Sequence, residues 1–305
     1  MSFTAITLIL VSAFTHAGWN LVSKKSKPSG AFFFFSTGFA VVCLSPVIAL
    51  YRREIFLVPA RVWLLLLCTG FFMALYYFSL AGAYRKGDIS LAYPIARSSP
   101  ILVVTFVSFV LGRADQIGSW AIAGILMVVA GCFLLPVKNL REFSFRNYLN
   151  LCCLLAFFAA IGTSGYTIID DRALFLMRNL PGKPFNPFSS AILYLCMEGA
   201  SCFFWLGIGV LSIGNERRKF VEFLGRGRRD IKLAMAAGIA IFATYGLVLS
   251  SMAFVRNVSY VAAFRQLSIP IGAFSGMLLL GEPPYRARIT GVFIIMAGLI
   301  MVALG

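Results

Sequence analysis

The sequence predicts an all-α integral membrane protein with ten transmembrane helices, built as two inverted five-helix repeats. Composition is the first observation: 60% of the 305 residues are hydrophobic and only 12% are charged, whereas a soluble domain carries about 25% charged residues. The second is the mean hydropathy of +0.89, because a chain with so few polar side chains cannot form a water-exposed surface. The third is a sequence repeat that relates the two halves of the chain.

Ten apolar stretches approach the length that one crossing of a bilayer requires, which is about 20 residues. Short groups of basic, glycine and proline residues separate them, and such groups usually mark turns of the chain. Transmembrane strands are not expected, since the stretches do not alternate polar and apolar residues. The first stretch has no basic segment before it, so we interpret it as a spanning helix rather than a cleaved signal. The expected spans are residues 3–22, 30–51, 62–83, 89–111, 117–136, 148–169, 189–213, 233–254, 258–280 and 289–304.

The repeat is clearest where residues 89–113 align without a gap with residues 258–282. At the same offset Tyr76 meets Tyr245. Five helices are an odd number, so the second repeat must cross the membrane in the opposite sense to the first. Inverted repeats of this kind are typical of secondary transporters, which hold their substrate near the membrane midplane. Unless two apolar helices align by chance, the chain divides into repeats at residues 1–140 and 141–305.

Charge and cysteine content limit the kinds of molecule that the protein is expected to bind. The net charge is +16, from 27 Lys and Arg against 11 Asp and Glu. The basic residues lie in the short gaps between apolar stretches, so we expect anionic lipid headgroups of the bilayer as their partner rather than nucleic acid. All seven cysteines lie inside apolar stretches without a C-x-x-C pair, which predicts neither disulfides nor a metal site. No cofactor is expected.

Two arginines and one glutamate fall well inside the expected spans. Arg97 and Arg265 each lie about eight residues, roughly 12 Å, into a helix, where an ionised group costs several kcal/mol unless protein or water faces it. A guanidinium beside tyrosine hydroxyls suits a carboxylate or phosphate group. Alternatively, each arginine pairs with backbone carbonyls or Glu198 and only holds helices together.

Glu198 has three open roles: the counter-ion of an arginine, a proton site for coupling, or a partner for a solute ammonium group. With two arginines, it leaves the spans with a formal charge of +1, which favours an anionic or zwitterionic solute. The remaining acids are expected in loops or at span ends. In particular, we expect Asp170, Asp171 and Arg172 to end the sixth helix at the membrane interface.

Polar side chains near these charges complete the expected solute site. His16 and Asn20 are four residues apart and share a helix face with Trp19 nearby, and a lone histidine does not predict a metal site. Tyrosine hydroxyls inside a span need a partner. Glycines at 118, 124, 131, 291 and 298 predict close packing of the fifth and tenth helices. The candidate solute-binding residues are His16, Trp19, Asn20, Tyr76, Tyr77, Tyr93, Arg97, Thr163, Tyr166, Tyr245, Tyr260, Arg265 and Gln266.

Two segments resemble motifs of the EamA branch of the drug/metabolite transporter superfamily. Residues 87–97, GDISLAYPIAR, are similar to its fourth-helix motif, and residues 259–268, SYVAAFRQLS, to its ninth. The resemblance implies ten helices in two inverted repeats around a cavity lined by helices one, three, four, six, eight and nine, through which amino acids or other small metabolites pass. The chain departs from the family pattern at Ala263-Phe264, where a proline is common, and at Gly112-Arg113, where a glutamate is common.

The distribution of basic residues among the loops and the family resemblance predict opposite orientations of the chain in the membrane. The odd-numbered loops hold 17 Lys and Arg and the even-numbered loops 8, which under the positive-inside rule puts the odd loops in the cytoplasm and both termini outside. Seven of those 17 lie in residues 216–232. The resemblance implies both termini in the cytoplasm.

These observations predict a permease in the cell's inner membrane that moves a small polar, anionic or zwitterionic metabolite by alternating access. The sequence lacks a G-x-x-x-x-G-K-[ST] motif, so a proton or an exchanged solute is expected to drive transport rather than ATP. An intramembrane enzyme is one alternative, although neither H-E-x-x-H nor G-x-S-x-G occurs. A channel is another, although the sequence contains no TVGYG-type filter segment.

Overall fold

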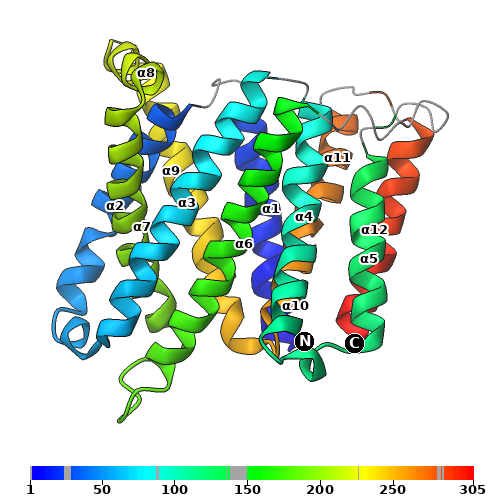
Figure 1. Cartoon of the computed structure of the whole chain (residues 1–305), viewed down its shortest axis with the longest axis horizontal. Coiled ribbons are helices and arrows are strands. Elements are labelled where there is room, and N and C mark those ends of the chain that lie inside the picture. The colour runs from blue at the N-terminus through cyan, green and yellow to red at the C-terminus, as the bar shows by residue number, and fades with distance from the viewer. Residues whose placement is uncertain are drawn as a thin grey trace.

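The computed structural model is helical in all its regular structure, across the part of the chain that it describes (Figure 1). Both chain termini lie at one end of the helix bundle, which we call the terminal end, and α8 lies at the other, the α8 end (Figure 1). The described residues are 2–23, 29–86, 89–135, 137, 150–225, 227–279, 283 and 285–305.

The first half of the chain supplies α1 to α5. Ser29 caps α2 by accepting a hydrogen bond from the Phe32 amide at 3.1 Å, and a side-chain cap of this kind satisfies an amide that the helix itself leaves unpaired. Two short 3-10 turns connect the helices. The elements are α1 (Phe3–Ser23), α2 (Gly30–Leu50), η1 (Glu54–Leu57), α3 (Ala60–Lys86), α4 (Ile89–Val110), η2 (Ala114–Gln116) and α5 (Ser119–Leu134).

The second half supplies the remaining helices. Asn150 and Asn186 cap α6 and α7, and Pro187 occupies the first turn of α7, where its missing N–H costs nothing. The elements are α6 (Leu151–Arg178), α7 (Pro187–Ser212), α8 (Gly214–Leu224), α9 (Arg228–Ser251), η5 (Met252–Phe254), α10 (Val258–Phe264), η6 (Arg265–Leu267), α11 (Ser268–Leu279) and α12 (Arg286–Leu304).

Among the described residues, six helical segments are long and apolar enough to cross a membrane: those that contain α2, α3, α6, α7, α9 and α12. Shorter apolar segments lie in α1, α4 and α5. These helices establish a multi-pass membrane protein, since a water-soluble helix of such length would present a polar face.

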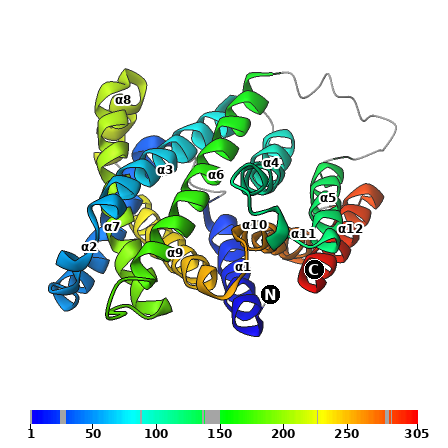
Figure 2. The same ribbon diagram turned by 60° about the horizontal axis from the view of Figure 1, so that its bottom comes forward.

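The fifth and last helices pack with their backbones in contact, as the glycine pattern predicts. A Cβ atom added to Gly124 would lie 2.5 Å from the carbonyl oxygen of Gly298, and one added to Gly131 would lie 2.7 Å from that of Gly291. Only hydrogen fits such spaces. Figures 1 and 2 show α5 and α12 side by side at one edge of the molecule and α2, α7 and α8 at the opposite edge.

The sixth helix ends later than the sequence predicts. We expect it to end near residue 169, but α6 continues to Arg178, so Asp170 lies inside the helix rather than at its end. Asp170 is fully buried. The helix continues past this acid because hydroxyl groups of neighbouring helices satisfy the carboxylate, as described below.

The expected ninth span is interrupted. Instead of one helix over 258–280, the structure has α10, the 3-10 turn η6 that begins at Arg265, and α11. Pro270 lies just beyond this turn and has no N–H for the carbonyl of Gln266, so the α-helical ladder cannot run through unchanged. The interruption brings Arg265 to the middle of the bundle.

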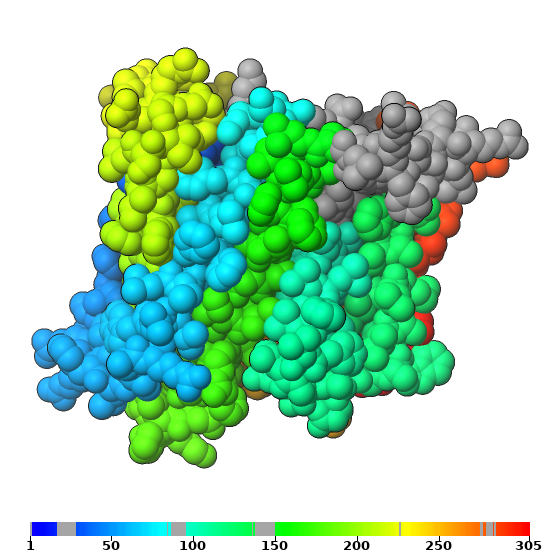
Figure 3. Space-filling model, in the orientation of Figure 1, coloured from blue at the N-terminus to red at the C-terminus, as the bar shows by residue number. Residues whose placement is uncertain are grey.

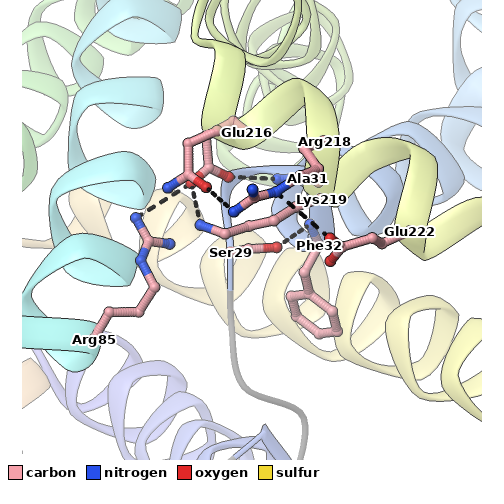
Figure 4. A network of polar contacts seen from close by, with 9 residues as sticks. Ser29, Ala31, Phe32, Arg85, Glu216, Arg218, Lys219 and Glu222 are labelled. Carbon is pink, nitrogen blue, oxygen red and sulfur yellow. Dashed lines mark hydrogen bonds and ion pairs between the residues drawn. The ribbon is translucent and has the colours of Figure 1, made fainter.

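The basic segment after α7, expected as a loop, contains the helix α8. Its Glu216 is buried and contacts two cations: Arg85 at the end of α3 at 3.2 Å and Lys219 at 2.8 Å (Figure 4). The amide of Ala31 at the start of α2 donates to the same carboxylate at 3.4 Å. The Phe220 ring stacks on the Phe35 ring of α2 with centroids 5.2 Å apart. These contacts hold α8 over the end of the bundle, where it forms a corner of the molecular surface (Figure 3).

Candidate functional site

A small cavity lies in the middle of the bundle, among side chains of α1, α3, α4, α6, α7, α9 and η6. Its volume is about 50 Å³, which accommodates only a few water molecules at about 10–15 Å³ each. The cavity is lined by Ser12, Ala13, His16, Met73, Tyr76, Tyr77, Arg97, Tyr166, Leu195, Glu198, Gly199, Ile241, Phe242, Thr244, Tyr245, Val248 and Arg265.

Arg97 reaches the cavity from α4. Its Nη2 atom donates a hydrogen bond to the Ser268 hydroxyl at 2.5 Å, and that hydroxyl donates to the carbonyl of Arg265 at 2.9 Å. The guanidinium therefore ties the first half of the chain to the first residue of α11. Ser268 follows directly after the 3-10 turn η6, so this contact lies at the helix break.

Arg265 reaches the cavity from the opposite half of the chain. Its Nη2 atom donates to the Tyr166 hydroxyl at 3.3 Å and its Nη1 atom to the Thr167 hydroxyl at 3.4 Å. The guanidinium carbon lies 5.4 Å from the centroid of the Tyr245 ring and 5.9 Å from that of the Tyr166 ring. Cation–π attraction at such distances favours the charged guanidinium in a site away from bulk water.

Asp170 contacts Tyr245 and is surrounded by hydroxyl groups. Its carboxylate accepts hydrogen bonds from Thr69 of α3 at 2.6 Å, from Tyr194 of α7 at 2.8 Å and from Tyr245 of α9. Three donors from three other helices stabilise one buried anion and fix the helices around it. The Tyr245 side chain thus contacts Asp170 through its hydroxyl and Arg265 through its ring.

Glu198 is the second buried acid at this site. It is fully buried and lines the cavity, and its oxygens have no hydrogen-bond partner among the residues that the structure describes. Asp170 and Glu198 together supply two negative charges against Arg97 and Arg265. With both acids ionised, the formal charge of this central group is zero rather than the +1 expected when Asp170 is left out. A neutral group favours a zwitterionic solute over a purely anionic one.

The predicted site residues divide into three groups. Eight line the cavity: His16, Tyr76, Tyr77, Arg97, Tyr166, Glu198, Tyr245 and Arg265. Thr163 donates to the carbonyl of Ala159, Gln266 donates to that of Ala262, and Tyr260 bonds to Gln116 and the amide of Gly118, so these three lie away from the cavity lining. The side chains of Trp19, Asn20 and Tyr93 are outside the described residues.

Sequence reasoning missed Asp170. A signal for it is present, because Tyr166 and Asp170 are four residues apart and so share one face of a helix. The apolar segment Ala173–Met177 also continues the helix beyond the acid. The adjacent Asp171, which lies 3.2 Å from Arg113 near the terminal end, makes the same segment resemble a helix end.

Comparison with known proteins gives a family match for the first part of the chain and a similar fold for the whole chain. Residues 3–137 match the family model described as the EamA-like transporter family. The chain matches no curated protein sequence. Its structure resembles a solved structure described as "Crystal structure of protein", with a TM-score of 0.65 and 16% sequence identity, over 98% of this chain and 97% of that one. At this identity the similarity concerns the fold alone.

Proposed function

Residues 3–137 match the EamA-like transporter family, and we propose that the chain is a permease of this family that moves a small polar metabolite across the cell's inner membrane by alternating access. The proposed solute is zwitterionic or anionic, with an amino acid as the simplest example. A proton or an exchanged solute drives the movement.

The proposed architecture is ten spans in two inverted repeats, at residues 1–140 and 141–305. The gapless match of residues 89–113 with 258–282 supports it. So do the lengths and order of the helices, if α10, η6 and α11 together make the ninth span and α8 lies outside the membrane. An inverted repeat places its solute site near the midplane, between the halves.

The observation that carries the proposal is the meeting of Arg97 and Arg265 at one cavity, each from a different half of the chain. Guanidinium groups bind carboxylates through paired, charge-assisted hydrogen bonds. Glu198 lines the same cavity and supplies the negative charge that a solute ammonium group requires. Tyr76, Tyr77, Tyr166 and Tyr245 add hydroxyl and ring contacts.

The cavity, at about 50 Å³, holds only a few waters, so solute entry requires the helices to move apart. Arg97 donates to the Ser268 hydroxyl and Arg265 donates to the Tyr166 hydroxyl, so both guanidinium groups already hold hydroxyl acceptors. In the proposed cycle the carboxylate replaces these hydroxyl acceptors at the arginines, and the two halves rock around it.

The test is solute counterflow in vesicles that contain the purified protein, with a mixture of radiolabelled amino acids as the probe. Arg97→Ala and Arg265→Ala should each reduce exchange to the level of empty vesicles. Arg61→Ala, which removes an exposed arginine at the start of α3, is the matched control and should exchange normally. Thermal unfolding confirms that each variant is folded. Full exchange by both cavity variants would remove the arginines from the solute site, and counterflow by the wild type excludes a channel.

A further inference from the structure

Two buried carboxyl groups lie in the middle of the bundle, on the neighbouring helices α6 and α7. Glu198 of α7 and Asp170 of α6 are both fully buried, and the two acids interact electrostatically. Tyr194 connects the two acids, because it lies one turn before Glu198 on α7 and donates to Asp170 at 2.8 Å.

The two acids differ in their hydrogen-bond partners. Asp170 accepts from three hydroxyl groups, which is the environment of an anion. Glu198 has no hydrogen-bond partner for either oxygen among the described residues. An ionised carboxylate only accepts hydrogen bonds, whereas a protonated one also donates. Two nearby carboxylates carry like charges and repel each other. A single proton on Glu198 removes this repulsion and lets Glu198 donate a hydrogen bond to Asp170.

We propose that the Glu198–Asp170 pair binds one proton on Glu198 in this closed state and releases it when the cavity opens to water. The step is a proton transfer only: the O–H bond of Glu198 breaks, water takes up the proton, and the carboxylate keeps the electron pair. It rests on the proposed transport function and names its coupling ion. Each round of opening and closing would then move one proton with, or against, one solute.

The groups around Glu198 are compatible with both its protonated and its ionised form. The titratable groups near it are Tyr77 of α3, Tyr245 of α9, and Tyr194 and Cys202 of its own helix. Arg265 of η6 is the nearby cation that can balance the Glu198 carboxylate after the proton leaves.

The cavity that Glu198 lines also contains His16 of α1 and Arg97 of α4. Water that enters this cavity reaches Glu198 before Asp170, because Asp170 does not line it. The exchanging proton is therefore placed on Glu198, while Asp170 stays the hydroxyl-caged anion that accepts from it.

The proton can be observed without knowing the solute. Exposed Asp and Glu side chains titrate near pH 4, so above about pH 6 only a protected carboxyl still gives the C=O stretching band of a protonated acid. Infrared difference spectra of the reconstituted full chain should show this band. Glu198→Gln should abolish it, whereas Glu222→Gln, which removes an exposed acid on α8, should leave it unchanged. A wild-type spectrum without the band, or an equal band in Glu198→Gln, overturns the proposal.

The unfolding temperature of Glu198→Gln provides a second measurement. Glutamine has the shape and neutral charge of the protonated glutamate, so Glu198→Gln should unfold at the same temperature as the wild type or higher. If it unfolds at a clearly lower temperature, the buried site needs the ionised acid and the proposal is wrong. Glu198→Asp keeps an ionisable group and should retain a band at a shifted frequency.

Transport then separates this proposal from the proposed function. With the radiolabelled amino-acid mixture in vesicles, two modes are measured: counterflow, which needs no driving force, and uphill uptake driven by an imposed pH gradient. Glu198→Gln should lose the uphill uptake, whereas Glu222→Gln should keep both modes. Loss of both modes in Glu198→Gln alone, with the infrared band absent from the wild type, overturns proton binding at Glu198. Absence of both modes in the wild type, with the band present, overturns the proposed solute class and leaves the proton site standing.

Discussion

The Arg85 guanidinium at the end of α3 lies 3.2 Å from the Glu216 carboxylate of α8, so an ion pair joins the two halves of the chain at the α8 end (Figure 4). Glu216 is buried, whereas Arg85 is about one-third exposed. The same carboxylate also contacts Lys219 and the amide of Ala31. A single acid thus holds α2, α3 and α8 together at the α8 end of the bundle, and movement of α8 away from α3 must break this cluster.

Glu216→Gln should destabilise the protein by about 1–3 kcal/mol. The change leaves Arg85 and Lys219 without their counter-charge, and breaking a buried pair costs about 3–5 kcal/mol, which water around the partly exposed Arg85 reduces. Thermal unfolding in detergent measures the effect. The control is Glu222→Gln, whose pair with Arg218 is exposed on both sides and should cost less than about 1 kcal/mol. Equal melting temperatures for the two variants would show that the cluster is not a structural tie.

Gly124→Ala should separate α5 from α12. The new Cβ atom would lie 2.5 Å from the carbonyl oxygen of Gly298, so the helix backbones must move apart at a cost of about 1–3 kcal/mol. The matched control is Gly272→Ala in α11, where a Cβ atom meets nothing within 4 Å. A lower melting temperature in Gly124→Ala alone supports the packing, and unchanged melting in both variants contradicts it.

The helices and the central arginines could be predicted from the sequence because hydropathy is a local property. Arg97 and Arg265 stand out since each is a charge surrounded by apolar residues on both sides. The break at Arg265 also has a local cause in Pro270, but the exact turn depends on the contact between Ser268 and Arg97, which lies 171 residues away.

Asp170 could not be predicted in the same way. Its neighbours Asp171 and Arg172 give the segment the composition of a helix end, and its burial depends on hydroxyl groups from distant parts of the chain. Thr69 is 101 residues away and Tyr245 is 75 residues away. Long-range partners decide whether a buried acid is tolerated, and hydropathy does not reveal them. The sequence does not predict the helix α8 for a related reason. Its Phe220 ring packs on Phe35 of α2, which is far away in the sequence.

Asp170→Asn should weaken solute binding as well as stability. An amide has one acceptor oxygen, so it cannot serve the hydroxyls of Thr69, Tyr194 and Tyr245 together, and at least one donor stays unsatisfied at a cost of about 1–3 kcal/mol. Tyr245 then loses the contact that places its ring at Arg265. We expect half-saturation of counterflow to rise about tenfold. Thr69→Val removes one donor and leaves the Tyr245 bond intact, so it should lower the melting temperature with little change in half-saturation.

Tyr245→Phe and Tyr245→Leu should separate the two contacts of Tyr245. Phenylalanine keeps the ring 5.4 Å from the Arg265 guanidinium and loses the hydroxyl that donates to Asp170. Leucine loses both contacts. If cation–π attraction places the guanidinium for the solute, with an energy of about 0.5–2 kcal/mol, the leucine variant should require a solute concentration several-fold higher than the phenylalanine variant for half-maximal counterflow. The comparison uses vesicles of equal protein content, and equal values for the two variants would show that only the hydroxyl of Tyr245 matters.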